Sequence, residues 1–428
     1  MVALATPAAY PNPRLLVAGA LRDLLERAYA GEPSGMAAER ALRPSVFPNV
    51  HDFITPAPCN MNTSTTLPTA SDDSLLKLNA ALQRAMPVTR LVDYGVPLGD
   101  AIAIHVRTGP DTPERWDEVC EAMASRHARL AAQAAASGAN LTAVEAWAAA
   151  AALYQAAQLA FNDDTTRKRN LYEASRQALL AHPAAGGSIE HLELPSAAGT
   201  LYGWSVPPAS SNHAAAVVII GGLSGWGSVY YGMAQALARR GILCILAEGP
   251  GQGSTRLLSG LHLDHATLPL FSRFVDHAFE RGAARVGVWG NSFGGLFAAH
   301  IASADARIDA VCINGAPMKP AVPDFRTARE QMCAVFGVDE TGLESRITSL
   351  RMAHGQHRIP GSLLVVEGGY DPLVPLGEQR SFFELADPAL CTLMKWPDGE
   401  HTIYNHAAER NAHVADWFRS RLAGGPSD

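Results

Sequence analysis

The chain has 428 residues, a length that predicts two or three domains, or one large α/β domain with a substantial addition. With 48% hydrophobic and 18% charged residues, the composition is that of a globular protein and excludes a disordered, collagen-like or disulfide-scaffold chain. The formal net charge is -7 and the sequence has no long Lys/Arg run, so we expect neither a nucleic-acid partner nor a membrane-surface partner.

The first part of the chain, from residue 14 to about 182, has a helical and Ala-rich pattern. Apolar residues at helical spacing predict helices over 21–29 and 75–86, and Thr142 with Glu145 forms a capping box that would start a long apolar helix. A further helix ends before Pro183. The segment 43–70 is rich in Pro, Asn and Thr and long for a loop, so we expect that it either packs on the other domain or is mobile.

The pattern changes at Pro183–Ser188, where the apolar period switches from helical spacing to alternation. We therefore divide the chain into a helical domain, 1–188, and a second domain, 189–428. The second domain opens with two alternating segments around a turn, as a β-hairpin would. Short apolar runs separated by helical stretches follow, and they predict a mostly parallel, doubly wound α/β sheet. The runs are 215–220, 242–247, 285–289, 310–313, 362–366 and 392–395.

The segment Gly290–Gly294 is a G-x-S-x-G motif that directly follows an apolar run and directly precedes a helical stretch. A serine in such a tight turn exposes its hydroxyl, and the helix N-terminus behind it provides N–H groups and a partial positive charge. Ser292 is therefore the candidate nucleophile. A Gly-rich turn with an incidental serine is the weaker interpretation, because downstream residues supply the partners that a nucleophile needs.

A serine nucleophile needs a histidine base and an orienting carboxylate, and in this architecture their chain order is Ser, Asp or Glu, then His. Asp371 and His401 each lie just after one of the last two apolar runs, so we assign them as the carboxylate and the base. Asp398 and Glu400 rank below Asp371 because they share the loop of the histidine. His406 is a weaker candidate base and is more typical of a structural histidine.

The loop after the 215–220 run is Gly-rich and is the candidate oxyanion loop. A backbone N–H of Leu223 or Gly222 would complete an oxyanion hole with the N–H of Phe293, since glycine lets the chain approach closely. A merely flexible loop is the alternative. Four further side chains would then face the substrate: Ser224, Trp226, Tyr230 and Tyr231.

Three other features favour structural over functional roles. Glu248 precedes a Gly-rich turn that lacks the G-x-G-x-x-G phosphate pattern, so we interpret it as the anchor of that turn. His262 and His265 have no third metal ligand nearby in the sequence. Asp324 opens a helical insertion of about 320–360 that we expect to cover the active site; it is either a substrate-facing carboxylate or, more commonly for such a residue, a solvated loop charge.

The cysteine pattern and the lack of long apolar stretches limit the functions that remain possible. The six cysteines never form a C-x-x-C pair, so we expect reduced thiols, no metal and no cofactor. No stretch approaches the roughly 20 apolar residues of a membrane span, and the N-terminus does not look like a secretory signal. We therefore expect a cytoplasmic protein with a small-molecule partner.

These motifs resemble the α/β-hydrolase superfamily. The helical first half, the hairpin and three Gly-rich segments together resemble the subgroup that contains 2,6-dihydroxypseudooxynicotine hydrolase, fungal polyketide-shortening hydrolases and fermentation-respiration switch esterase-like proteins. The segments are Gly221–Leu223, Gly249–Gly253 and Gly290–Gly295. The resemblance is specific over the C-terminal part and covers the first half only in layout. Members usually carry Asp where Glu248 stands, which leaves the three candidate catalytic residues untouched.

The resemblance implies hydrolysis of a C–C bond next to a ketone, in an aryl or polyketide-like substrate, by Ser292, Asp371 and His401. The residues alone leave open ester, thioester or lactone hydrolysis, acyl transfer to an alcohol, and a non-catalytic binding or regulatory protein on this fold. The Ser, Asp, His order argues against the last. We expect the helical half to cap the pocket, to select the substrate and to contribute to a homodimer.

Overall fold

The computed structural model describes residues 70–111, 113–209, 214–324 and 326–423, and all of these belong to one compact unit. The helix expected over 21–29 and the Pro-, Asn- and Thr-rich segment up to residue 69 lie outside the described residues. The description below therefore starts at residue 70.

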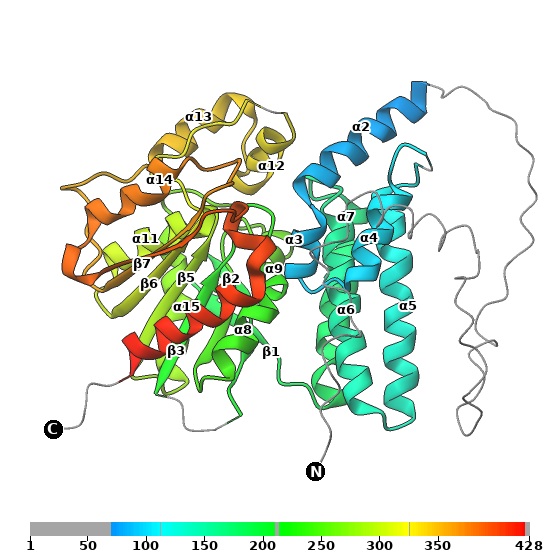
Figure 1. Ribbon diagram of the computed structural model, residues 1–428, viewed down its shortest axis with the longest axis horizontal. Coiled ribbons are helices and arrows are strands. Elements are labelled where there is room, and N and C mark those ends of the chain that lie inside the picture. Colours follow the sequence, from blue (N-terminus) through cyan, green and yellow to red (C-terminus); the bar gives the residue numbers. More distant parts are fainter. Residues whose placement is uncertain (1–69, 112, 210–213, 325, 424–428) are drawn as a thin grey trace, which may run out of the picture. The chain divides into compact units, whose positions relative to one another are not determined.

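Helices make up the described chain before the sheet (Figure 1). They are α2 (Ala70–Ala85), α3 (Val88–Asp93), α4 (Leu98–Arg107), α5 (Trp116–Ala136), α6 (Asn140–Gln158) and α7 (Thr166–Ala181). Pro87 and Pro97 stand directly before α3 and α4, where proline commonly begins a helix because the first N–H groups have no intrahelical partner. Helix α6 is mostly buried alanine, as its apolar sequence predicts, but it begins before Thr142 and has no side-chain cap. The capping-box expectation was therefore wrong.

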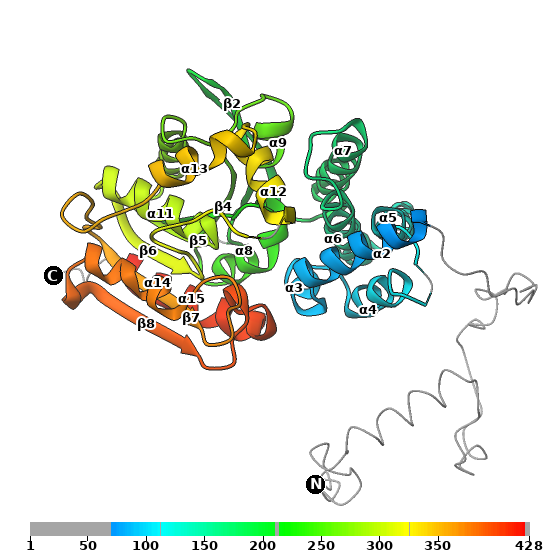
Figure 2. The ribbon, with the colours of Figure 1, turned by 90° about the horizontal axis from the view of Figure 1, so that it is seen from above.

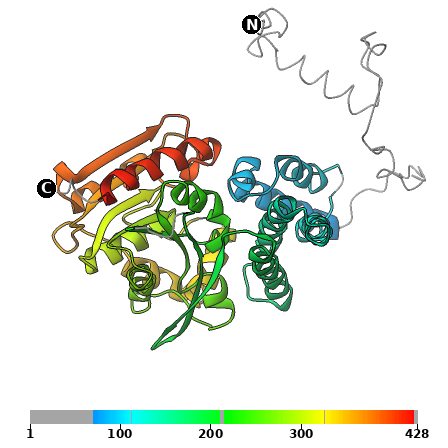
Figure 3. The ribbon, with the colours of Figure 1, turned by 90° about the horizontal axis from the view of Figure 1, so that it is seen from below.

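The strands of the described chain form one eight-stranded sheet in the order β1-β2-β4-β3-β5-β6-β7-β8. Their bounds are β1 (Glu190–Ser196), β2 (Gly199–Val206), β3 (Ala215–Ile220), β4 (Leu243–Glu248), β5 (Arg285–Asn291), β6 (Ile308–Asn314), β7 (Ser362–Gly368) and β8 (Cys391–Trp396). The hairpin β1–β2 is antiparallel, and β3 to β8 are parallel. Figures 2 and 3 show the hairpin and β8 at opposite edges. The predicted mostly parallel α/β sheet is confirmed.

Both faces of the sheet are covered, which explains why its strands are continuous apolar runs. Helices α8 (Tyr231–Ala238) and α15 (Ala407–Leu422) pack on one face, and α10 (Ser272–Glu280) and α11 (Phe293–Ala304) on the other. Of these, α8, α11 and α15 are labelled in Figure 1. Alternate side chains of one strand enter different cores. In β3, for example, Val217 and Ile219 belong to the first core, and Ala216 and Val218 to the second.

The two cores also differ in what else they contain. The core under α8 and α15 is continuous with buried side chains of the N-terminal helices, among them Leu91, Trp116 and Leu153. The opposite core includes Met332 and Leu343, from the two helices between β6 and β7. The remaining helices are α9 (Gly253–Leu257), α12 (Arg326–Phe336), α13 (Glu340–Ser349) and α14 (Leu376–Arg380).

Candidate active site

Ser292 lies in the turn between β5 and α11, in a backbone conformation that non-glycine residues rarely adopt. Its φ is 54° and its ψ -133°. The flanking glycines make this turn possible, because a Cβ at Gly290 would lie 2.2 Å from the carbonyl oxygen of Gly294. A Cβ at Gly294 would lie 2.3 Å from the carbonyl oxygen of Ile220. The backbone N–H of Ser292 donates to Asn314 on β6 at 2.8 Å, which ties the turn to the neighbouring strand.

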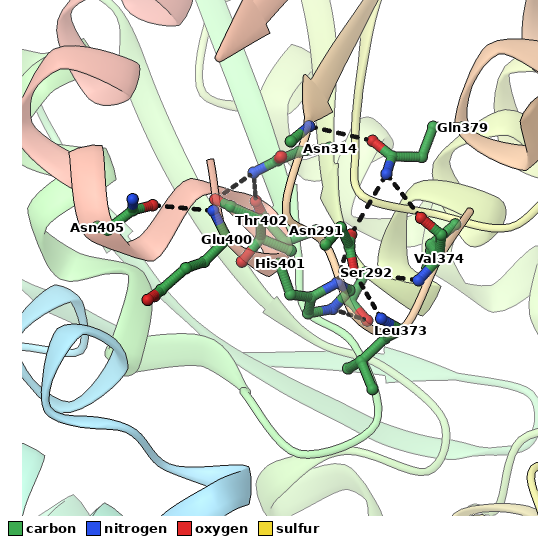
Figure 4. Close-up of polar contacts among 12 residues, drawn as sticks. Asn291, Ser292, Asn314, Leu373, Val374, Gln379, Glu400, His401, Thr402 and Asn405 are labelled. Carbon is green, nitrogen blue, oxygen red and sulfur yellow. Dashed lines mark hydrogen bonds and ion pairs between the residues drawn. The ribbon is translucent and has the colours of Figure 1, made fainter. Parts of the chain in front are cut away.

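The three residues expected to form a triad are brought together, and Figure 4 labels two of them, Ser292 and His401. The Oγ of Ser292 lies 2.9 Å from Nε2 of His401, and Nδ1 of His401 lies 2.8 Å from Oδ2 of Asp371. The His401 side chain is 7% exposed and that of Asp371 is 1% exposed. An ionised Asp371 can only accept, so Nδ1 carries the proton and Nε2 is left to accept from the serine hydroxyl.

Backbone and side-chain donors fix the second carboxylate oxygen of Asp371. Its Oδ1 accepts from the N–H groups of Leu373 at 2.8 Å and of Val374 at 3.0 Å. Gln379 approaches Oδ2 at 3.5 Å and donates to the carbonyl of Val374 at 2.8 Å (Figure 4). The loop after β7 therefore holds the carboxylate in one orientation toward His401.

The loop that follows His401 has two consecutive left-handed residues, Thr402 (φ 53°) and Ile403 (φ 64°). Such conformations are costly for β-branched residues and persist only where the surroundings hold them. The carbonyl of Thr402 accepts from Nδ2 of Asn314 at 3.1 Å and from Nη1 of Arg410 at 2.7 Å. These two bonds hold the strained loop next to the histidine.

Arg410 is in turn paired with Asp93 on α3. The two side chains make hydrogen bonds of 2.7 and 3.0 Å, and they are 0% and 2% exposed. Glu400, the residue directly before His401, accepts from the hydroxyl of Thr89 at 2.6 Å. Helix α3 thus contacts the His401 loop through a buried ion pair and a hydrogen bond.

The predicted oxyanion loop passes close to the serine. A Cβ at Gly222 would lie 2.9 Å from Cβ and 3.2 Å from Oγ of Ser292. Gln252 donates to the carbonyls of Gly221 at 2.6 Å and of Gly222 at 3.1 Å. In a trans peptide the N–H points opposite to the carbonyl, so the N–H groups of Gly222 and Leu223 point away from Gln252.

The side chains predicted to face the substrate have different surroundings. Ser224 accepts from Nη2 of Arg90 at 2.7 Å, and Tyr230 is 5% exposed with its ring 5.8 Å from that of Tyr94. The ring of Tyr231 lies 5.6 Å from that of His182, at the end of the N-terminal helices. Asp324 is exposed in the loop before α12.

Trp226 is 2% exposed, and two basic side chains, Lys168 and Arg256, lie 5.2 and 5.1 Å from the centroid of its ring. Its Nε1 donates to the carbonyl of Leu223 at 3.1 Å, which gives the candidate oxyanion loop a rigid support. Burial, together with the positive charge of Arg256, lowers the pKa of Lys168 to about 7. The buried indole of Trp226 therefore supports the candidate oxyanion loop through its hydrogen bond to Leu223.

Glu248 lies at the end of β4 and is fully buried. It accepts from the hydroxyl of Tyr172 at 2.5 Å, from Nε1 of Trp204 at 3.1 Å and from the N–H of Ser254 at 2.7 Å. Burial and the nearby Glu248 carboxylate raise the pKa of the Tyr172 phenol, so it remains a donor. These contacts fit the structural role expected for Glu248 and join α7 to the sheet.

The sequence interpretation missed Thr89, Arg90, Asp93 and Arg410. Pro87 before a short apolar segment was the only local signal for α3. The contacts that connect these residues to the site include partners more than 130 positions away along the chain, and no periodicity reports such contacts.

No membrane-crossing helix or metal cluster occurs in the part of the chain that the structure describes. None of its helices has both the length and the apolar character needed to cross a bilayer. No group of three or more His, Cys, Asp or Glu side chains there is placed to hold a metal ion.

Comparisons with known proteins show the fold. No protein-family model and no curated protein matches the sequence. The structure is similar to the crystal structure of 2,6-dihydroxy-pseudo-oxynicotine hydrolase, with a TM-score of 0.69 and 22% identity over 78% of this chain and 95% of that chain. It is also similar to wild-type AbyA5, with a TM-score of 0.56 and 18% identity over 76% and 95% of the two chains. With its mostly parallel sheet, the chain has the α/β-hydrolase fold.

Proposed function

We propose that the protein is a serine hydrolase in which Ser292 is the nucleophile, His401 the general base and Asp371 the orienting carboxylate. The observation that carries the proposal is the unbroken hydrogen-bond chain from Ser292 through His401 to Asp371. The strained backbone of Ser292 supports it, because such strain persists where the position of a side chain matters.

In the proposed reaction, His401 takes the proton of the Ser292 hydroxyl as Oγ attacks a carbonyl carbon. The N–H groups of Phe293 and Leu223 stabilise the negative charge on the carbonyl oxygen. The bond to the leaving group then breaks, and His401 returns the proton to that group. A water molecule, deprotonated by His401, releases the acyl group from Ser292 and restores the free serine.

We further propose that the scissile bond is a C–C bond next to a ketone in an aryl or polyketide-like substrate. The resemblance of the Gly-rich segments to the hydrolase subgroup supports this choice. Breaking such a bond leaves the electron pair on carbon, so the leaving fragment must itself stabilise it, as an enolate or electron-rich ring does. The protonated His401 then supplies the proton that completes the fragment. The helical segment before β1 would select the substrate, since its side chains share a core with the sheet.

A substrate panel separates this proposal from ester hydrolysis or acyl transfer. We expect aryl β-diketones to be cleaved with turnover at least comparable to that of p-nitrophenyl esters, because the site would be adapted to a carbon leaving group. The measurement is kcat/KM for both classes, with product identification by mass spectrometry. Rapid ester cleavage without any ketone cleavage would contradict the C–C assignment and favour an esterase or an acyl transferase.

Covalent labelling tests the serine-hydrolase proposal without knowledge of the substrate. A fluorophosphonate is expected to add one phosphonyl group per chain, located on Ser292 by peptide mass spectrometry, because it reacts with activated serines. His401→Ala should slow this labelling strongly, and heat-denatured protein should not react. Labelling spread over several serines, or equal labelling of native and denatured protein, would count against an activated Ser292.

A further inference from the structure

Arg90, on α3, bridges two loops of the candidate active site. Its Nη2 donates to Ser224 at 2.7 Å, in the candidate oxyanion loop, and to the hydroxyl of Tyr94 at 2.9 Å. Its guanidinium also lies 5.3 Å from the ring centroid of Tyr404, in the loop that follows His401. The other terminal nitrogen, Nη1, donates to the carbonyl of Ala85 at 2.7 Å.

All of these acceptors are neutral, so the positive charge of Arg90 has no counter-charge among the described residues. Two acidic side chains on or against the same helix have other partners, Asp93 with Arg410 and Glu400 with Thr89. The Nε of Arg90 is buried and has no hydrogen-bond partner. The N–H of Nε is thus unused, while the residue as a whole remains only half-buried.

The charge on Arg90 cannot be lost by deprotonation. Burial works to lower the pKa of Arg90, but the Tyr404 and Tyr94 phenols act in the opposite direction, and the net effect is a raised pKa. Arginine remains protonated in proteins in any case. The rings of Tyr94 and Tyr404, with centroids 5.0 and 5.3 Å from the guanidinium, compensate the cation only weakly in comparison with a carboxylate partner.

Arg90 contacts residues of both loops that flank the Ser292–His401 pair. Ser224 lies two positions after Gly222, whose backbone approaches Ser292. On the other side, the ring of Tyr404 lies 6.1 Å from that of His401. A ligand held by Arg90 would therefore lie between the oxyanion loop and the histidine loop, next to the reacting carbonyl.

We propose that Arg90 binds an anionic oxygen of the substrate, a carboxylate or an ionised enol, and that the enzyme is selective for acyl or ketone substrates that carry such a group close to the scissile carbonyl. Both N–H donors of Nη2 are already bonded to Ser224 and Tyr94, so recognition of the anion would rest on the charge of the guanidinium and on its unused donor, not on a bidentate pair. This inference rests on the proposed function, since it assigns the substrate class of the same site.

A protection experiment tests the inference without turnover. The ketones 3-acetylbenzoate and 4-acetylbenzoate, and the matching neutral benzamides, compete with the fluorophosphonate for Ser292. In the wild-type protein we expect at least one carboxylate to give half-protection at a concentration about tenfold lower than its amide, because only the anion pairs with the guanidinium. Arg90→Met should bring this ratio close to one, and Arg90→Lys should leave an intermediate ratio. Arg84→Met, which removes an exposed arginine of α2, should keep the wild-type ratio.

The outcomes separate the two proposals. If native protein is not labelled at Ser292, the serine-hydrolase proposal fails. If labelling occurs but acid and amide protect wild type equally, the Arg90 inference fails alone. An unchanged preference in Arg90→Met also overturns it, and would leave Arg90 a support for Ser224. Should Arg90→Met not fold, as judged by its melting curve, the wild-type comparison and Arg90→Lys still decide.

Discussion

Replacing Ser292 with alanine is expected to lower kcat/KM for the preferred substrate by about 10⁴-fold or more, because the nucleophile is removed while the fold is kept. The residual rate would come from the oxyanion hole and from substrate binding. Steady-state kinetics on the purified variant provide the measurement, with product formation followed for hours. The melting temperature should change by only a few degrees, since the substitution removes one oxygen atom.

Ser420→Ala is the matched control for this substitution. Ser420 lies near the end of α15 and donates to the carbonyl of Trp417 at 2.8 Å, so its loss affects a helix end rather than the site. Its activity should equal that of the wild type. Wild-type turnover by Ser292→Ala would rule out a nucleophilic role for this serine and would contradict the proposed mechanism.

Asp93→Asn is expected to destabilise the protein by about 3–5 kcal/mol, because it leaves the guanidinium of Arg410 buried without a charge partner. Arg410 also bonds to the carbonyl of Thr402, so we expect kcat to fall about tenfold as His401 loses its fixed position. Urea unfolding followed by circular dichroism gives the stability, and kinetics well below the melting temperature give kcat.

Asp416→Asn serves as the control for the buried pair. Asp416 pairs with Arg240 in a similar bidentate geometry, with distances of 2.6 and 3.0 Å, but its side chain is 61% exposed. The expected loss of stability is below about 1 kcal/mol, and kcat should not change. Equal losses of stability in Asp93→Asn and Asp416→Asn would show that burial does not explain how much the Asp93–Arg410 pair stabilises the protein.

The sheet and the three central site residues could be predicted because their signals are local. The β5 strand, the Gly290–Gly294 turn and α11 are adjacent in sequence, and the carboxyl ends of parallel strands bring Asp371 and His401 to the same edge. Each of these steps depends on a strand run, a turn residue or chain order. These signals were therefore sufficient to predict the sheet and the positions of Ser292, Asp371 and His401.

The contribution of α3 could not be predicted, for a physical reason. Thr89 and Asp93 owe their roles to partners near the other end of the chain, and Arg90 to Ser224, 134 positions away. A six-residue helix carries little periodic pattern, and a charged residue in it is usually solvated. The start of α6 was missed for a related reason, since the packing of its alanines extends the helix past the Thr142 cap signal.

The continuous core between the N-terminal helices and one sheet face has a consequence for how such a protein can diversify. Leu91 and Leu153 pack in the same cluster as Val217 and Trp417, so substitutions on either side must remain complementary in volume. Recombination with a relative at the β1 boundary would join surfaces that were never adapted to each other. New substrate preferences are therefore reached more easily by changing single side chains around the candidate site than by exchanging the helical half as a module.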